Sequence, residues 1–371
     1  MFISDRVLFY KGKKYLLLRP MRNFLLFVLF SFSVSAFGQS VDDDQKMHLM
    51  RNRPFPKDTI WPKLSTVYYD DYSNQLGLFL QAKHKTTNVI ITDRLSDSRF
   101  DYSPKNQLYL GPGFTYKLIG NGLSLSFGLL NNKDKGEPVK RIDIYVNFIL
   151  KKVVFDFGFR FYQNFTLKNS ADYSMGSSGG DYVRPDIKTI YMGVGGVYVL
   201  NHEKFSYRAT FTQTAIQKKS AGSLMLGAQV FLQGMMGDSS IFPSSAGLPN
   251  VTSNSSVYLG LTAAYAYNFV FEKYYFLAMA LSSTLELGKA VTLLNHNERY
   301  TNHYPILHLQ PRIVLGINKP KWYFGASIRR DYYQQLFKPD DSRFDFVFNT
   351  VTFKVFYGHR FNWLSRKQLR E

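Results

Sequence analysis

The sequence predicts an all-β protein, a closed antiparallel transmembrane β-barrel of about twelve strands, with roughly ten to fourteen as the range. Three observations predict this fold. Runs of ~10 residues alternate large apolar side chains with small or polar ones, as strands that cross a bilayer do. The connectors between runs have two sizes, which is typical of short periplasmic turns and longer extracellular loops. An export signal precedes the runs, and no other stretch approaches the length of a membrane helix.

Composition excludes several classes of protein. The mean hydropathy of −0.20 is too low for a bundle of membrane helices, and the 17% aromatic content suits strands. With no cysteine the chain has no disulfide framework, no thiolate metal site and no lipid-modified amino-terminal cysteine. The formal charge of +19 favours anionic partners, either nucleic acid or phosphorylated lipid surfaces, although solvated loops would account for it equally well.

The amino-terminal segment has the features of a signal peptide for export. Residues 21–38 contain Arg22, an apolar run from Phe24 to Phe32, and a small-residue cleavage site that ends at Gly38. We expect a cleaved signal peptide over 21–38, with translation starting at Met21 and residues 1–20 being a start-site overcall. The polar, turn-rich residues 39–73 are expected to form a periplasmic lead-in. Residues 74–363 would then form the barrel, and 364–371 a polar tail.

The stretch FDFGFRF, residues 155–161, shows the strand pattern most clearly. Its four phenylalanines share one face of a strand, and Asp156, Gly158 and Arg160 share the other. A soluble sandwich would bury the rings in its core, whereas a membrane barrel would turn them toward lipid. Sandwich strands cluster at ~5–6 residues, so the longer runs favour the barrel. The other runs are GLSLSFGLL, RIDIYVNFIL, TIYMGVGGVYV, FSYRATFTQTA, LMLGAQVFL, VYLGLTAAYAYNF, YFLAMALSSTLEL and VTFKVFY.

The connectors give the expected polarity of the barrel. The short ones are residues 119–122, 151–152, 201–204 and 318–321, and the long ones are 131–138, 169–184, 237–254 and 295–303. A barrel with both ends in the periplasm needs an even number of strands. The predicted strands do not fit this even number near residues 217–222, because the long connector 237–254 follows the short connector there too closely along the chain. Aromatic residues near strand ends would form interfacial girdles: Tyr109, Tyr116, Tyr162, Tyr198, Tyr267, Tyr274, Tyr275, Trp322 and Tyr323.

Three stretches resemble an uncharacterised outer-membrane barrel family known as a domain of unknown function. They are YYDDYSNQLGLFLQAKHKTTNVIITD at 68–93, YSPKNQLYLGPGFTYK at 102–117 with GLSLSFGLL at 122–130, and QKKSAGSLMLG at 217–227. The resemblance covers roughly residues 60–361. It implies an outer-membrane location and a barrel, and it carries no activity, substrate or catalytic residues.

Charged residues on the second face of the strands are the candidates for the inside of the barrel. They are Arg141, Asp143, Asp156, Arg160, Arg208, Glu286, Arg312, Arg329 and Asp331. Charges of both signs could pair across strands and reinforce the wall, or they could line a selective passage. Barrels of about eight strands are filled by side chains, and those of ~16–18 strands enclose an aqueous channel. About twelve strands therefore predict a narrow or occluded pore.

The sequence shows no convincing catalytic or cofactor pattern. None of the seven histidines has a serine two positions later, the spacing that would place both on one strand face. The group His296, Glu298, His303 and His308 has metal-ligand types but no ligand spacing, and we interpret it as polar loop residues. We therefore expect no enzyme, no cofactor and no metal site.

The expected function is a narrow pore or small-molecule transport channel in the outer membrane. The first alternative is a structural or binding barrel that engages lipopolysaccharide or a partner protein through residues 169–184 and 237–254. The second is a lipid-modifying enzyme. Expected partners are outer-membrane lipid, lipopolysaccharide and the barrel-assembly machinery that inserts the protein, and nucleic acid is not among them. The sequence fixes neither a substrate nor an oligomeric state.

Overall fold

The structure is a computed structural model that describes residues 66–104, 107–117, 127–128, 140–173, 182–294, 298–337 and 343–361. All of them belong to one compact unit that starts at Leu64. The expected signal peptide at 21–38, residues 1–20, most of the lead-in and the polar tail at 364–371 lie outside the described residues.

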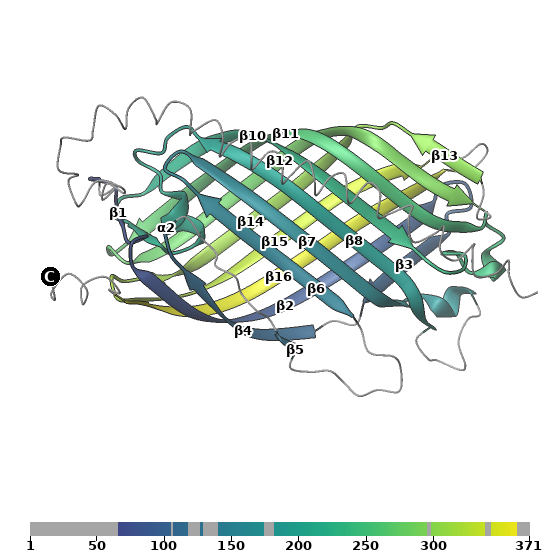
Figure 1. Cartoon of the computed structure of the whole chain (residues 1–371), viewed down its shortest axis with the longest axis horizontal. Coiled ribbons are helices and arrows are strands. Elements are labelled where there is room, and N and C mark those ends of the chain that lie inside the picture. Colours follow the sequence, from purple (N-terminus) through teal and green to yellow (C-terminus); the bar gives the residue numbers. More distant parts are fainter. Residues whose placement is uncertain are drawn as a thin grey trace, which may run out of the picture. The chain divides into compact units, whose positions relative to one another are not determined.

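Ten strands of the described chain close into a ring in which every neighbouring pair is antiparallel (Figure 1). The ring closes where the last strand pairs with the first, from Phe344 opposite Asp93 to Phe361 opposite Leu76. In order, the strands are β2 (Leu76–Asp93), β3 (Arg99–Pro104), β7 (Val153–Leu167), β8 (Tyr182–Val199), β10 (Ala221–Met236), β11 (Val251–Phe271), β12 (Tyr275–Leu294), β14 (Ile306–Asn318), β15 (Trp322–Phe337) and β16 (Phe344–Phe361). The predicted closed antiparallel barrel is confirmed.

Shorter strands complete the wall. They are β4 (Gln107–Thr115), β5 (Phe127–Gly128), β6 (Arg141–Ile149) and β13 (Glu298–Asn302). β4 continues the pairing of β3 along β2, β5 pairs with β4, and β6 pairs with β7. Ten strands therefore close the ring, and β5 and β6 bring the strand paths to twelve within the described residues. β13 extends the edge of β12, inside the connector 295–303 that was expected to be a loop.

The two faces of the wall differ as the alternation predicts. Along β11, Leu259, Leu261 and Tyr265 are 61%, 75% and 53% exposed, whereas Thr262 and Ala264 between them are buried. Such a surface is stable in lipid and would be unusual in water, where contiguous apolar patches of this extent are rare. β11 has 21 residues, about twice the ~10 that cross a bilayer at a tilt, so the barrel extends beyond the apolar band.

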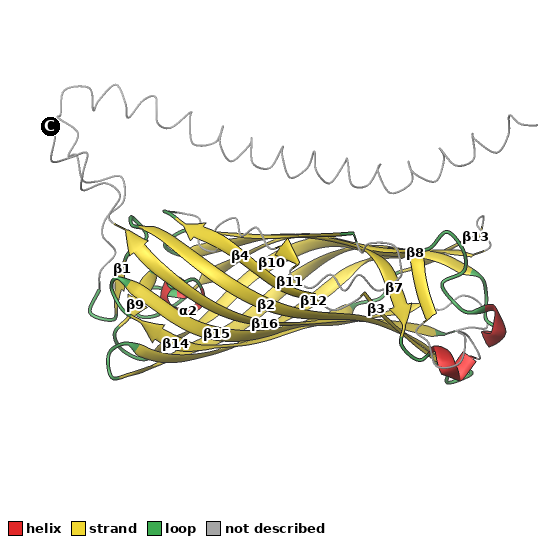
Figure 2. Cartoon of the chain, turned by 90° about the horizontal axis from the view of Figure 1, so that it is seen from below, coloured by secondary structure: helices red, strands yellow, loops and turns green. Residues whose placement is uncertain are grey.

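Residues 205–217 lie inside one end of the barrel, and the predicted strand FSYRATFTQTA is wrong. The segment forms the short helix α2 (Tyr207–Phe211), capped by the Ser206 hydroxyl, and then β9 (Ala215–Gln217), which pairs with β1 (Tyr69–Asp71). Figure 2 shows α2 within the ring beside β9. Every residue from 209 to 217 is buried, so the segment has no face to present to lipid. We call residues 205–217 the plug segment. Removing this strand from the count also removes the parity conflict near 217–222.

The opposite end is closed by the connector between β10 and β11. Residues 237–250, with the short helix η2 (Ser244–Ala246), turn inward, and Ile241 and Phe242 are fully buried. The Phe242 ring lies 4.9 Å from that of Phe344 and 5.1 Å from that of Phe100, and Tyr102 donates a hydrogen bond to the Ile241 carbonyl. The connector 169–184 is shorter than predicted, since β8 begins at Tyr182; it contains the short helix η1 (Ser170–Tyr173).

The aromatic girdle is confirmed only in part. Tyr198 and Tyr275 are exposed on the outer face, but Tyr109, Tyr162 and Tyr323 are buried inside the barrel. The phenol of Tyr162 donates to Asp143, and that of Tyr109 accepts from Arg141, so polar partners in the lumen hold these rings inward.

Within the described residues, no helix is long and apolar enough to span a membrane.

Candidate functional site

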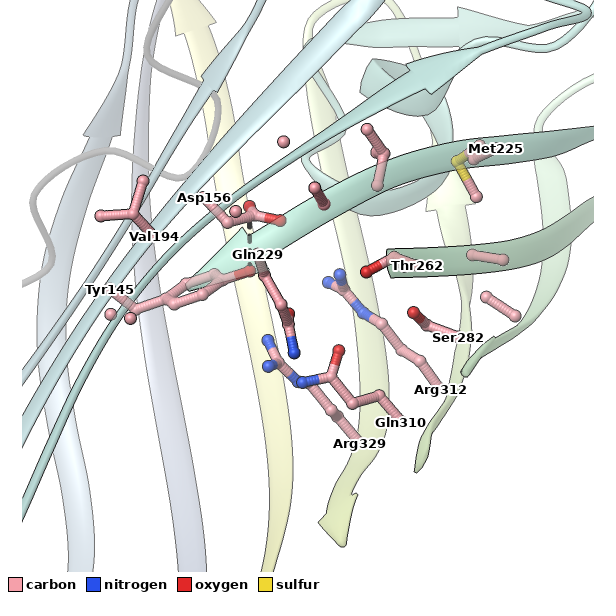
Figure 3. Close-up of a pocket in the computed structure, with 18 of the residues that line it drawn as sticks. Tyr145, Asp156, Val194, Met225, Gln229, Thr262, Ser282, Gln310, Arg312 and Arg329 are labelled. Atoms are coloured by element: carbon pink, nitrogen blue, oxygen red, sulfur yellow. Dashed lines mark hydrogen bonds between the residues drawn. The ribbon is translucent and has the colours of Figure 1, made fainter. Parts of the chain in front are cut away.

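A polar chamber lies in the lumen between the two closed ends. It encloses a cavity of about 130 Å³, which is room for several water molecules or a small solute. Inward-facing side chains of β6, β7, β8, β10, β11, β12, β14 and β15 line it, and Tyr207 and Phe211 of α2 form its boundary toward the plug segment. Figure 3 shows Gln229, Gln310 and Arg329 pointing toward one another, with Arg312 alongside.

Glycines of β8 make room for the larger lining residues. A Cβ atom on Gly193 would lie 2.6 Å from the Tyr191 phenol oxygen, and one on Gly195 would lie 3.1 Å from the Gln229 Cβ. Both distances are too short for an undisturbed side chain. In the stretch GVGG at 193–196, Gly193 and Gly195 are therefore explained by the space that Tyr191 and Gln229 occupy in the lumen, and Gly196 by the Phe155 ring on the outer face.

Acids in the lumen are bound by cations and hydroxyls from several strands. Asp331 accepts hydrogen bonds from Arg329, at 2.8 and 3.0 Å, and from Arg160 at 3.4 Å. The Arg160 guanidinium also stacks on the Tyr191 ring, 4.3 Å from its centroid. Because Asp331 is almost fully buried between two arginines, its charge is compensated where water cannot screen it.

Two further acids of the lumen also have partners. Asp143 forms an ion pair with Lys85 and lies directly opposite Arg160 in the pairing of β6 with β7. Asp156 accepts hydrogen bonds from Tyr145, at 3.1 Å, and from Asn147. We call the set Lys85, Asp143, Asp156, Arg160, Arg329 and Asp331, with their tyrosine and asparagine donors, the paired network.

A different arrangement crosses β14, β15, β16 and β2. Arg312 lies directly opposite Arg329, and Lys354 lies directly opposite Lys83. Both pairs place like charges in register on the inner face, an arrangement that costs stability in a sheet. We call Arg312, Arg329, Lys354 and Lys83 the basic stripe. Arg329 belongs to both sets because Asp331, two positions along β15, accepts its hydrogen bonds.

A third cluster surrounds His308. Its Nδ1 lies 3.1 Å from the Gln229 amide nitrogen and 3.3 Å from a Glu286 carboxylate oxygen, and its Nε2 lies 3.1 Å from the Gln310 amide nitrogen. Gln229 also donates to Glu286, and both His308 and Glu286 are fully buried. Both ring nitrogens thus contact side-chain amides or a carboxylate, and no hydroxyl is among the hydrogen-bond partners of the imidazole within the described residues.

The expectation that His296, Glu298, His303 and His308 are polar loop residues needs correction at two positions, Glu298 and His308. His308 is an inward residue of β14 and not part of a polar loop, because the strand begins at Ile306. Glu298 lies on β13, His303 follows it, and His296 lies outside the described residues. No group of three metal-ligating side chains occurs within the described ranges.

The structure brings most of the nine predicted luminal residues together. Asp143, Asp156, Arg160, Arg329 and Asp331 form the paired network; Arg312 lies in the basic stripe, and Glu286 lies with His308. Arg141 lies nearer the rim, with its guanidinium 3.0 Å from the Tyr109 phenol oxygen and over the Tyr162 ring. Arg208 does not lie on a strand: it belongs to α2, and its guanidinium donates to the Lys117 and Ile149 carbonyls.

Six residues that face the lumen were not predicted from the sequence. They are Lys83, Lys85, Gln229, His308, Gln310 and Lys354. Gln229 and Lys354 alternate with apolar residues in LMLGAQVFL and VTFKVFY, so the second-face rule could have found them. Lys83 and Lys85 lie in KHKTTN, which is polar on both faces, and no apolar side there shows which residues point inward.

Comparison with solved structures finds β-barrel proteins at low identity. The outer membrane protease OmpT from Escherichia coli matches with 8% identity and a TM-score of 0.40, over 80% of this chain and 100% of its own. The toluene transporter TodX from Pseudomonas putida matches with 10% identity and a TM-score of 0.25, over 78% of this chain and 90% of its own. The β domain of the Bordetella autotransporter BrkA matches with 13% identity and a TM-score of 0.30, over 77% of this chain and 100% of its own.

A search of curated proteins finds none that matches the chain. A family model described as a domain of unknown function, DUF4421, matches residues 58–361. This range contains every described strand of the barrel and agrees with the three stretches on which the resemblance was based. The chain, an outer-membrane type of β-barrel with a polar chamber in its lumen, belongs to the DUF4421 family.

Proposed function

We propose that the protein is a gated channel for small polar solutes in the outer membrane. The observation that carries the proposal is the polar chamber, which is bounded on one side by Tyr207 and Phe211 of the plug segment. Residues 237–250 close the far end of the same lumen. Neither closure is a strand of the ring. Each could move without breaking the pairing that holds the barrel together.

Polar contacts with three strands of the wall help to hold the plug segment. Asn268 donates to the Thr210 hydroxyl at 3.2 Å, Asn318 donates to the Ala215 carbonyl at 2.9 Å, and Arg360 donates to the Gln213 carbonyl. Gln213 itself has a φ of 53°, a conformation that a residue other than glycine adopts at a cost. These hydrogen bonds contribute about 1 kcal/mol each. Arg208 also donates to the Ile149 carbonyl, and Phe205 and Phe211 are buried, so opening must displace both polar and apolar contacts.

The absence of cysteine in the sequence allows a direct test of gating. Thr210→Cys combined with Asn268→Cys replaces two side chains already in hydrogen-bond contact, so that a disulfide would fix the plug segment to β11. In planar bilayers we expect the oxidised variant to be silent and the reduced variant to conduct. The single variant Thr210→Cys serves as the control and should conduct under both conditions. A wild-type protein and a reduced variant that are both silent would contradict the proposal.

The location is part of the same proposal. We expect export through the segment 21–38 and insertion by the barrel-assembly machinery, with the apolar outer face meeting lipid and lipopolysaccharide. The connector 237–250 is a poor candidate for presenting a binding loop, because Ile241 and Phe242 are buried. Membrane fractionation with a heat-modifiable gel shift tests the location, and recovery of the wild type in buffer without detergent would contradict it.

A further inference from the structure

Arg312 is a cation inside the barrel that forms no ion pair in the described chain, although Asp156 also lines the chamber. Its guanidinium carries five N–H donors. Among the described residues it makes one hydrogen bond, at 3.3 Å to the Phe211 carbonyl, and it lies 4.4 Å from the centroid of the Phe211 ring. The rest of its donors face the chamber, which it helps to line. A planar fork of this kind matches the two oxygens of a carboxylate.

Lys354 adds a second charge to the same side. Its ammonium lies 4.8 Å from the centroid of the Phe356 ring, two positions along on the same face of β16. Ser327, opposite Lys354 in the pairing with β15, lies two positions from Arg329, which in turn lies opposite Arg312. The stripe therefore continues from the chamber across three strands, and no ion pair of Lys354 is found in the described residues.

Each acid of the lumen has ion-pair or hydrogen-bond partners other than Arg312 and Lys354. Asp143 is paired with Lys85, and Asp331 with Arg160 and Arg329. Asp156 is bound by Tyr145 and Asn147, and Glu286 by Gln229 and His308. A wall whose charges served only to hold strands together would place an acid within ion-pair distance of Arg312 and Lys354. These two cations thus have the capacity to bind an anion that the described residues do not supply.

We propose that the chamber is a binding site for a small organic carboxylate, held by the Arg312 guanidinium and attracted by Lys354. A carboxylate fits better than inorganic phosphate because part of the chamber is apolar, formed by Phe211, Met225, Ala264 and Ala280. The short apolar chain of the ligand would lie against these residues, and its carboxylate would lie at Arg312. This deepens the proposed function by naming the class of solute, and it rests on that function only for how the ligand reaches the chamber.

The test compares two ions of the same length and opposite charge. The full barrel is refolded in detergent in the presence of radiolabelled n-butyrate or n-butylammonium, so that access through the closed ends is not required, and retention is measured by equilibrium dialysis at low salt. We expect one butyrate per chain and no retained butylammonium. Inorganic phosphate should compete at least tenfold less well than unlabelled butyrate. Equal retention of the two ions, no retention of butyrate, or stronger competition by phosphate would overturn the proposal.

Substitutions at Arg312 and Lys354 test whether these residues of the basic stripe bind the carboxylate. Arg312→Gln should weaken butyrate binding at least tenfold, and Lys354→Gln should weaken it about threefold. The matched control is Arg330→Gln, the same residue type on the outer face of β15, where the guanidinium contacts Asn349; it should bind as the wild type does. A heat-modifiable gel shift verifies folding of each variant. Unchanged binding in Arg312→Gln, or equal loss in Arg330→Gln, would overturn the assignment.

Failure of this inference is distinguishable from failure of the channel. Butyrate retained by a barrel that never conducts after release of the plug segment would support the site and refute the channel. A conducting barrel that retains no butyrate would support the channel and refute the site.

Discussion

The paired network and the basic stripe occupy the same inner wall, and they differ in how their charges meet. In the paired network an acid lies opposite or beside a cation, as Asp143 does with Arg160 and Lys85. In the basic stripe like charges lie opposite each other, as Lys354 does with Lys83. Both arise from the same alternation of strand residues. The difference teaches that inward charge alone does not identify a functional surface; the identity of the neighbour across the strand does.

The largest expected effect comes from breaking the paired network at its centre. Asp331→Asn leaves Arg160 and Arg329 without the carboxylate that both bind, and the loss of one partner in a buried pair costs about 3–5 kcal/mol. Urea-induced unfolding in lipid vesicles, followed by gel mobility, measures this loss. Asp172→Asn removes an exposed acid and should leave the free energy of unfolding unchanged. Equal stability of the two variants would show that the network does not hold the wall.

The outer face gives a second large effect and separates wall from lumen. Phe157 is an outward residue of β7 between the inward Asp156 and Gly158, and Phe157→Arg should reduce the free energy of insertion by about 2–4 kcal/mol if the site lies near the bilayer midplane. The measurement is the folded fraction recovered from membranes. Phe157→Leu keeps an apolar side chain and should insert normally. An arginine variant that inserts as well as the leucine variant would refute the lipid-facing assignment.

Two inward lysines test the comparison directly. Lys85→Met should destabilise the barrel because it leaves Asp143 without its ion pair. Lys354→Met removes a charge that faces Lys83, and it should leave the free energy of unfolding unchanged or raise it by up to about 1 kcal/mol. Unfolding in vesicles measures both. If the two substitutions cost the same, the distinction between paired network and basic stripe does not hold.

The smallest expected effect concerns Asp156. Asn at this position keeps the acceptor for the Tyr145 hydroxyl and the Asn147 amide, so Asp156→Asn should change stability by less than about 1 kcal/mol. It removes a negative charge from the chamber lining. In bilayer recordings of the reduced Thr210→Cys, Asn268→Cys variant, adding Asp156→Asn should therefore increase the preference for anions. A shift of the reversal potential toward cations would contradict this.

The plug segment shows where prediction from sequence failed. FSYRATFTQTA alternates as a wall strand does, with Phe205, Tyr207 and Phe211 on one side. Its residues from 209 to 217 are nevertheless buried on all sides, because the segment lies within the ring. Alternating apolar and polar residues show that the two faces of a segment have different surroundings. They do not show whether the apolar face contacts lipid or the interior of the barrel. For the same reason, the sequence did not show that Tyr109, Tyr162 and Tyr323 point into the lumen.

The sequence by itself determined the closed barrel, most of its strands, and the outward direction of faces such as that of FDFGFRF, because strand periodicity and the apolar requirement of lipid are local properties. The tertiary structure alone decided which charges meet. Arg160 and Asp331 are 171 positions apart, and their contact depends on the stagger of the whole ring. It also decided that the plug segment and residues 237–250 close the lumen, since only the surrounding wall provides a surface on which those side chains can be buried.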